Sequence, residues 1–140
     1  MRTNELMIGN FIYIKNRKVP EIVRVDKIDG KRLLCRRFDK AEAIEVSPKL
    51  CYPIPITEEW LTKNDFKKEY SPIVEYCSYK RLIDGYYVDV QFGCSNMGDD
   101  YVNCHIDNCD RCTVANADIQ YVHQLQNLLN IMNIKFDIKL

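Results

Sequence analysis

The stretch from Tyr121 to Leu140, YVHQLQNLLNIMNIKFDIKL, decides the fold at the C-terminal end of the chain. Between Val122 and Met132 the apolar residues recur at spacings of three and four, the pattern of one face of an α-helix. After Asn133 the period falls to two, with apolar positions at Ile134, Phe136, Ile138 and Leu140. The sequence therefore predicts a helix that leads directly into a terminal strand, both packed into a core.

The first fifty residues carry the signals of short antiparallel strands joined by tight turns. Four apolar runs are separated by turn-forming residues, of which Asp29 and Gly30 are the strongest pair. The runs span residues 11–14, 22–28, 33–35 and 43–46. Short strands with tight turns favour a curled sheet. We therefore expect residues 1–56 to form an SH3-like antiparallel β unit.

The middle of the chain predicts a short helix and a second sheet. Prolines at 48, 53 and 55 allow at most an edge strand there, and Thr57 then provides a helix N-cap. Further strands are expected at residues 71–82 and 86–92, and a hairpin at residues 101–102 and 112–114. The predicted fold class is α+β, with residues 57–140 as a second unit or continuous with the first. Its sheet is antiparallel and packed by the terminal helix.

Composition and charge limit the class of protein. The 140 residues are 46% hydrophobic and 29% charged, values typical of a folded globular protein. No apolar run is long enough to span a bilayer, and the N-terminus lacks a secretory signal, so we expect a cytoplasmic location. The net charge is zero, but residues 1–50 are basic and residues 84–120 acidic. Such polarity can steer an oppositely charged partner or a second copy of the chain, although a solvated surface without a partner is the commoner explanation.

Cysteines provide the sharpest chemical pattern. In CSNMGDDYVNCHIDNCDRC, the C-x4-C-x2-C spacing resembles the ligand spacing of zinc and plant-type iron–sulfur sites. The candidate metal ligands are Cys94, Cys104, His105, Cys109 and Cys112. A structural zinc site, an iron–sulfur cluster, and unligated thiols or a disulfide all remain open. Only one C-x2-C pair is present, and a plant-type cluster needs a further cysteine downstream.

Basic residues cluster at the turns predicted for the N-terminal unit, near aromatic residues. Phosphate contacts by Lys and Arg, combined with stacking on aromatic rings, are the means by which small β-barrels bind nucleic acid. The candidate nucleic-acid-binding residues are Lys15, Arg17, Lys18, Lys31, Arg32, Arg36 and Arg37. Against this hypothesis, dedicated nucleic-acid domains are usually strongly basic, whereas this chain is neutral.

No catalytic pattern is visible in the sequence. A phosphate-binding glycine loop, an H-E-x-x-H helix and a nucleophile elbow are all missing. A cysteine nucleophile with His105 or His123 as its base lacks the flanking residues that such a pair needs. We therefore expect a protein that is not an enzyme.

Three stretches resemble a known family. The opening MRTNELMIGNFIYI, the connector PIPITEEWLTKNDF and the closing YVHQLQNLLNIM are similar to small uncharacterised proteins of anaerobic gut bacteria, their phages and mobile elements. The resemblance covers about a third of the chain, and residues 93–117 depart from it. It implies a phage or mobile-element setting, hence the host cytoplasm, and supplies no catalytic residues.

Together these observations predict a non-enzymatic binding protein of phage or mobile-element origin. It would sequester or inhibit a host protein, such as a defence protein, or a signalling nucleotide. The alternatives are a nucleic-acid-binding module that uses the basic N-terminal face, and a metal-stabilised oligomerisation module. A homo-oligomer is compatible with each of them, and no membrane partner is expected.

Overall fold

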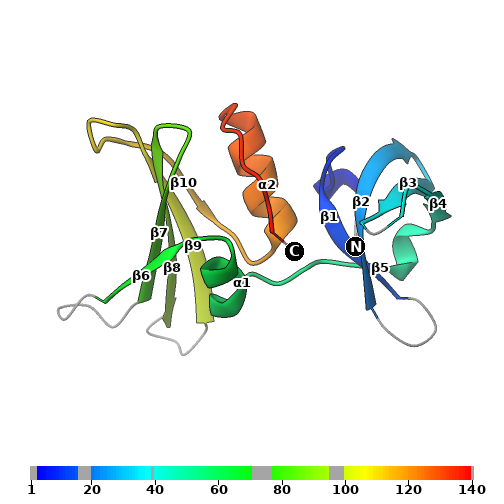
Figure 1. Ribbon diagram of the computed structural model, residues 1–140, viewed down its shortest axis with the longest axis horizontal. Coiled ribbons are helices and arrows are strands. Elements are labelled where there is room, and N and C mark those ends of the chain that lie inside the picture. The colour runs from blue at the N-terminus through cyan, green and yellow to red at the C-terminus, as the bar shows by residue number, and fades with distance from the viewer. Residues whose placement is uncertain (1–2, 16–19, 39, 71–76, 95–99, 140) are drawn as a thin grey trace. The chain divides into compact units, whose positions relative to one another are not determined.

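The computed structural model describes residues 3–15, 20–38, 40–70, 77–94 and 100–139, which form two antiparallel sheets and two α-helices (Figure 1). This confirms the predicted α+β class. The chain divides into two compact units. One comprises Met1–Pro55 and Tyr121–Asn127, and the other Ile56–Gln120 and Leu128–Leu140, so the helix α2, Val122–Ile131, supplies residues to both.

The first sheet has the strand order β4-β3-β2-β1-β5. Its elements are the 3-10 helix η1 (Thr3–Glu5), β1 (Phe11–Lys15), β2 (Pro20–Asp29), β3 (Arg32–Arg37), β4 (Ala43–Val46), the 3-10 helix η2 (Pro48–Leu50) and β5 (Cys51–Tyr52). All four predicted apolar runs lie in strands, and the proline-rich connector contributes only the two-residue edge strand β5. The SH3-like description stays a prediction.

Side chains of α2 hold the segment that precedes β1. Asn10 is fully buried and donates from Nδ2 to Oδ1 of Asn127 over 2.8 Å. The Oε1 atom of Gln126 accepts from the backbone N–H of Phe11 over 2.9 Å, and its Nε2 atom donates to the carbonyl of Gly9 over 3.2 Å. Two stretches that carry the family resemblance are therefore in direct contact. Their polar residues satisfy buried backbone groups that no strand partner reaches.

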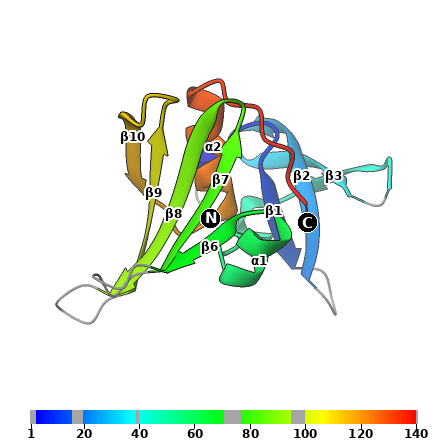
Figure 2. The same cartoon turned by 60° about the vertical axis from the view of Figure 1, so that its left-hand side comes forward.

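The second sheet has the order β10-β9-β8-β7-β6 (Figure 2). Its strands are β6 (Lys67–Tyr70), β7 (Cys77–Ile83), β8 (Tyr86–Cys94), β9 (Asp100–Asp107) and β10 (Thr113–Asp118). A hairpin forms in the predicted region, but its register differs: Thr113 pairs with Asp107, and Tyr101 and Val102 have no pairing partner in β10. The strand β6 was not predicted from the sequence, because its four residues, KKEY, are all exposed and show no apolar pattern. Residues 71–76, predicted as part of a strand, lie outside the described residues.

The predicted helix α1 spans Glu58–Lys63. Its N-cap is Thr57, whose Oγ1 atom accepts from the backbone N–H of Trp60 over 3.1 Å, and Asn64 forms the C-cap. The two charged glutamates of the first turn complement the helix dipole, as the sequence indicated. In the described part of the chain, no helix is long and apolar enough to cross a membrane.

The predicted terminal strand is wrong, because the residues described after Asn133 form no strand. Asn133 has a φ of 56°, a left-handed conformation that ends the helix. The alternating apolar residues instead pack individually, and Phe136 makes edge-to-face contacts with Trp60 and Phe66. The side chain of Asn64 takes the place of a neighbouring strand by bonding both the N–H and the carbonyl of Lys139, at 2.8 and 2.9 Å. Leu140 lies outside the described residues.

Candidate binding surface

The candidate site lies on the face of the second sheet that points away from the apolar side chains of that sheet. On β8, Val88 and Val90 are fully buried, whereas Tyr87, Asp89 and Gln91 alternate with them and point to the opposite face, as predicted. The strand register carries this alternation across the whole sheet. One cross-strand row consists of Lys67, Lys80, Asp89, His105 and Asn116. We call this side of the second sheet the outer face.

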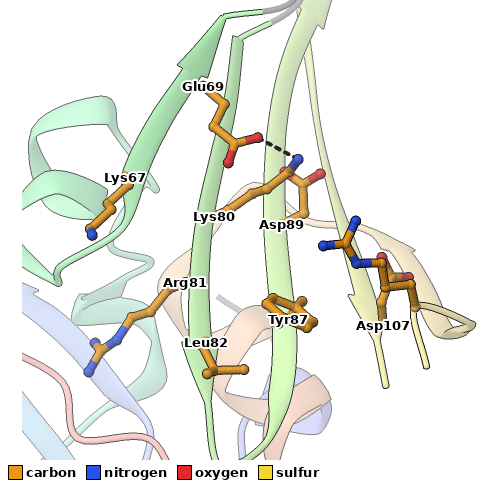
Figure 3. Close-up of a pocket in the computed structure, with 9 residues that line it drawn as sticks. Lys67, Glu69, Lys80, Arg81, Leu82, Tyr87, Asp89 and Asp107 are labelled. Carbon is orange, nitrogen blue, oxygen red and sulfur yellow. Dashed lines mark hydrogen bonds and ion pairs between the residues drawn. The ribbon is translucent and has the colours of Figure 1, made fainter. Parts of the chain in front are cut away.

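A cavity of about 450 Å³ opens on the outer face. Figure 3 shows side chains from neighbouring strands around it, with Lys80 directed towards Glu69 and lying beside Asp89. The lining residues are Lys67, Glu69, Lys80, Arg81, Leu82, Tyr87, Asp89, Asp107 and Arg111. The cavity thus contains charges of both signs together with an aromatic and an aliphatic side chain.

Asp89 is the most enclosed ionisable group of the outer face, with only 8% of its surface exposed. Its Oδ1 atom accepts a hydrogen bond from the hydroxyl of Ser78, and its Oδ2 atom accepts from Nε2 of Gln91 over 2.9 Å. Both donors are neutral side chains. They offset the loss of hydration of the carboxylate without cancelling its charge.

The cations of the cavity differ in availability. Lys80 forms a 2.6 Å ion pair with Glu69. Arg81 is directed away from these residues (Figure 3), donates to the backbone carbonyl of Asn64 over 2.7 Å, and places its guanidinium over the ring of Phe136. Its charge is therefore engaged on the other side of the sheet. Lys67 lies directly opposite Lys80 in the register, which leaves positive charge at the β6–β7 end of the outer face.

The β9–β10 turn supplies Arg111 at the other end of the cavity. Asn108 builds this turn, because its Oδ1 atom accepts from the backbone N–H groups of Asp110 and Cys112 over 3.0 and 2.9 Å. Arg111 itself has a φ of 59°. Beside the turn, Asp107 accepts from the hydroxyl of Thr113 over 2.8 Å, so its carboxylate is also held by a neutral donor.

The candidate metal ligands are distributed over different environments. Cys104 is fully buried with the apolar side chains of the sheet, and burial together with the charge of Asp89 raises the pKa of its thiol to about 12. His105, the next residue of β9, points to the outer face. Cys109 and Cys112 are exposed in the turn, and the side chain of Cys94 lies outside the described residues. Within the described part, no three metal-binding side chains come together, and the zinc site stays a prediction.

The arginines of β2 and β3 are engaged with carboxylates. Arg32 pairs with Glu45 at 2.7 Å, Arg36 with Asp26 at 2.8 Å, and Arg37 with Glu21 at 2.6 Å. The hydrogen bond from Arg36, together with one from Arg24, lowers the pKa of the Asp26 carboxyl below its ordinary value. Lys15 and Lys31 are exposed, whereas Arg17 and Lys18 lie outside the described residues.

His123, the candidate base on the terminal helix, is buried and packed against an aromatic ring. It is 1% exposed, and its ring stacks on Tyr121 with 5.8 Å between ring centroids. Neither of its ring nitrogens has a hydrogen-bond partner among the described residues, and burial lowers its pKa. These properties are those of a neutral packing residue of α2.

Sequence reasoning identified the outward direction of Tyr87, Asp89 and Gln91 but did not select them as a site. The available signal was a carboxylate in the centre of an otherwise apolar and aromatic run, YYVDVQF. Lys67 and Glu69 gave no signal, because they lie on the unpredicted strand β6. Comparison of the chain with protein-family models, curated proteins and solved structures finds no match.

Proposed function

We propose that the chain is a non-enzymatic binding protein and that the outer face of the second sheet is its recognition surface. The observation that carries this proposal is the cavity of about 450 Å³, which the enclosed Asp89 carboxylate and side chains of both charge signs line. Concave sites with a few fixed polar groups are the usual places of specific binding.

The arrangement of reactive groups favours binding over catalysis. The hydroxyl of Ser78 donates to Asp89, so it is not bonded to an imidazole that would remove its proton. The thiol of Cys104 lies among apolar side chains, and its raised pKa keeps it protonated at neutral pH. Neither side chain is therefore placed as an activated nucleophile, and neither lines the cavity.

The charge distribution favours a protein partner over a nucleotide. Carboxylates and cations line the same cavity, and the carboxylates are those of Glu69, Asp89 and Asp107. These carboxylates would repel the phosphate groups of a nucleotide. A protein segment with both acidic and basic side chains matches such a surface. Leu82, which is 60% exposed, and Tyr87 add the apolar contact area on which specific protein interfaces depend.

The resemblance to proteins of phages and mobile elements supports a host protein as the target. A chain of this kind acts by occupying a surface that the target needs for its own interactions. The partner is therefore expected in the lysate of a gut anaerobe, the setting that the resemblance implies.

The experiment compares captures by the full wild-type chain and by two variants with matched changes. Leu82→Glu adds a charge inside the cavity, whereas Val114→Glu adds one at an exposed apolar position of β10 that does not line it. We expect at least one host protein to bind the wild type and Val114→Glu and to be lost with Leu82→Glu. If mass spectrometry finds the same retained proteins for all three baits, the outer face is not the recognition surface.

A further inference from the structure

Inside the cavity, an aromatic residue neighbours two carboxylates, one across the strands and one along its own strand. Tyr87 on β8 is the direct cross-strand partner of Asp107 on β9, and Asp89 follows Tyr87 by two residues on the same face. Side chains at such positions are about 5 Å apart across the strands and about 7 Å apart along one strand. Tyr87 is 38% exposed, so part of its ring is accessible from the cavity.

Both carboxylates are held by neutral hydrogen-bond donors. The hydrogen bonds to Asp89 come from Ser78 and Gln91, and that to Asp107 from Thr113, all neutral donors. Among the described residues, no ion pair reaches either carboxylate. Each carboxylate oxygen has two lone pairs, so capacity for further donors remains.

We infer that Tyr87, Asp89 and Asp107 form a subsite for an arginine side chain of the partner protein. This inference rests on the proposed function and specifies the chemistry of its partner. A guanidinium can stack on the tyrosine ring while its N–H groups bond a carboxylate at the ring edge. Arginine fits better than lysine, because its planar group is less strongly hydrated and presents several donors at fixed angles.

Arg111 is a cation close enough to influence this subsite, because it belongs to the same cavity lining. It lines the same cavity from the β9–β10 turn and carries the same charge as the proposed ligand group. Its positive charge opposes the entry of a second guanidinium, and its removal is expected to strengthen binding. This effect gives the subsite a signature that a general loss of structure cannot imitate.

The test uses the ¹⁵N-labelled full chain and Nα-acetyl-arginine amide as the probe, followed by nuclear magnetic resonance. The control ligand is Nα-acetyl-citrulline amide, which keeps the shape and loses the charge. We expect saturable shifts of the amides of Tyr87, Asp89 and Asp107 with the arginine probe and none with citrulline. Asp107→Asn is expected to weaken binding about fivefold or more, the effect of one charged contact.

Further variants separate the subsite from general surface charge. Asp118→Asn, on the same sheet but outside the cavity, is expected to leave the affinity unchanged. Arg111→Gln is expected to raise it. Equal shifts with the citrulline ligand, no binding of the arginine probe, or an Asp107→Asn variant that binds as tightly as the wild type would each overturn the inference.

The result can also be distinguished from a failure of the proposed function. If a host protein depends on Leu82 but the arginine probe fails, the recognition surface stands and the arginine subsite does not. If the probe binds as expected but no captured protein depends on Leu82, the subsite stands as a cation site and the proposed function falls.

Discussion

Two carboxylates, Asp26 on the first sheet and Asp89 on the second, are held in opposite ways. On the first sheet, Asp26 lies within hydrogen-bonding distance of both Arg24 and Arg36, and Glu45 pairs with Arg32, so cations and carboxylates neutralise each other. On the second sheet, Asp89 is enclosed and held by neutral donors, beside cations and an exposed tyrosine ring. A segment that is basic in sequence is therefore not necessarily a cationic surface. The pairing of charges in the folded sheet decides what each surface can bind.

The largest expected loss of stability follows from a substitution on the second sheet. Asp89→Ala removes the acceptor of the hydroxyl of Ser78, a residue that is 4% exposed, and leaves a gap in the lining of the cavity. An unsatisfied buried donor costs about 1–3 kcal/mol, so we expect a loss of about 2–3 kcal/mol in the free energy of unfolding. Urea unfolding monitored by circular dichroism measures the loss. Asp118→Ala, at an exposed position of β10, is the control and should change stability by less than about 0.5 kcal/mol.

The corresponding change on the first sheet, Asp26→Ala, is expected to cost less than about 1 kcal/mol. Both arginine partners of Asp26 have about half of their side-chain surface exposed, 48% and 49%, and water replaces the lost ion pairs. The same urea titration provides the comparison. A larger loss for Asp26→Ala than for Asp89→Ala would reverse the proposed contrast.

The pH dependence of Asp26 is a smaller effect with a defined sign. Because its arginine partners lower its pKa in the folded state, its contribution to stability is fully present above the unfolded value, 3.8, and is lost as the pH falls through the lower folded pKa. The stability difference between wild type and Asp26→Asn should therefore be constant above pH 5 and shrink below pH 4. Unfolding titrations between pH 3 and pH 7 test this expectation, and a difference that grows towards low pH would contradict it.

The smallest expected effect concerns nucleic acid. Because Arg36 and Arg37 are already paired with Asp26 and Glu21, we expect no measurable binding of single-stranded RNA or DNA at physiological salt. Fluorescence anisotropy should give the same flat response for the wild type and for the double variant Arg36→Glu and Arg37→Glu. Salt-sensitive binding that the double variant abolishes would instead support the nucleic-acid alternative.

Local signals in the sequence predicted local structure well. Thr57 with the two following glutamates predicted α1, because a cap and a first turn depend on neighbouring residues. The alternation in β8 predicted which side chains face outwards, because successive side chains of a strand point to opposite faces of the sheet. The turn predicted at Asp29-Gly30 lies one residue later, at Gly30 and Lys31, because Asp29 still pairs with Arg32; Gly30 has a φ of 42°, which glycine adopts without strain.

Features that depend on distant residues were not predicted. The alternating apolar residues after Asn133 do not form a strand, and one of them, Phe136, packs against Trp60 and Phe66. The hydrogen bonding of the Asn64 side chain to the backbone of Lys139 has no signature in the sequence. The cavity combines residues from Lys67 to Arg111, and only the register of the second sheet brings them together. The cysteine spacing similarly did not reveal that Cys104 is buried while Cys109 and Cys112 are exposed.

The central claim is that the second sheet, and not the basic first sheet, carries the recognition surface. Quantitative capture of host proteins with wild type, Leu82→Glu, and the Arg36→Glu and Arg37→Glu double variant tests it most directly. We predict that one host protein is depleted at least tenfold with Leu82→Glu and retained at the wild-type level by the double arginine variant. Loss of the captured protein with the arginine variant and its retention by Leu82→Glu would contradict the claim and assign recognition to the first sheet.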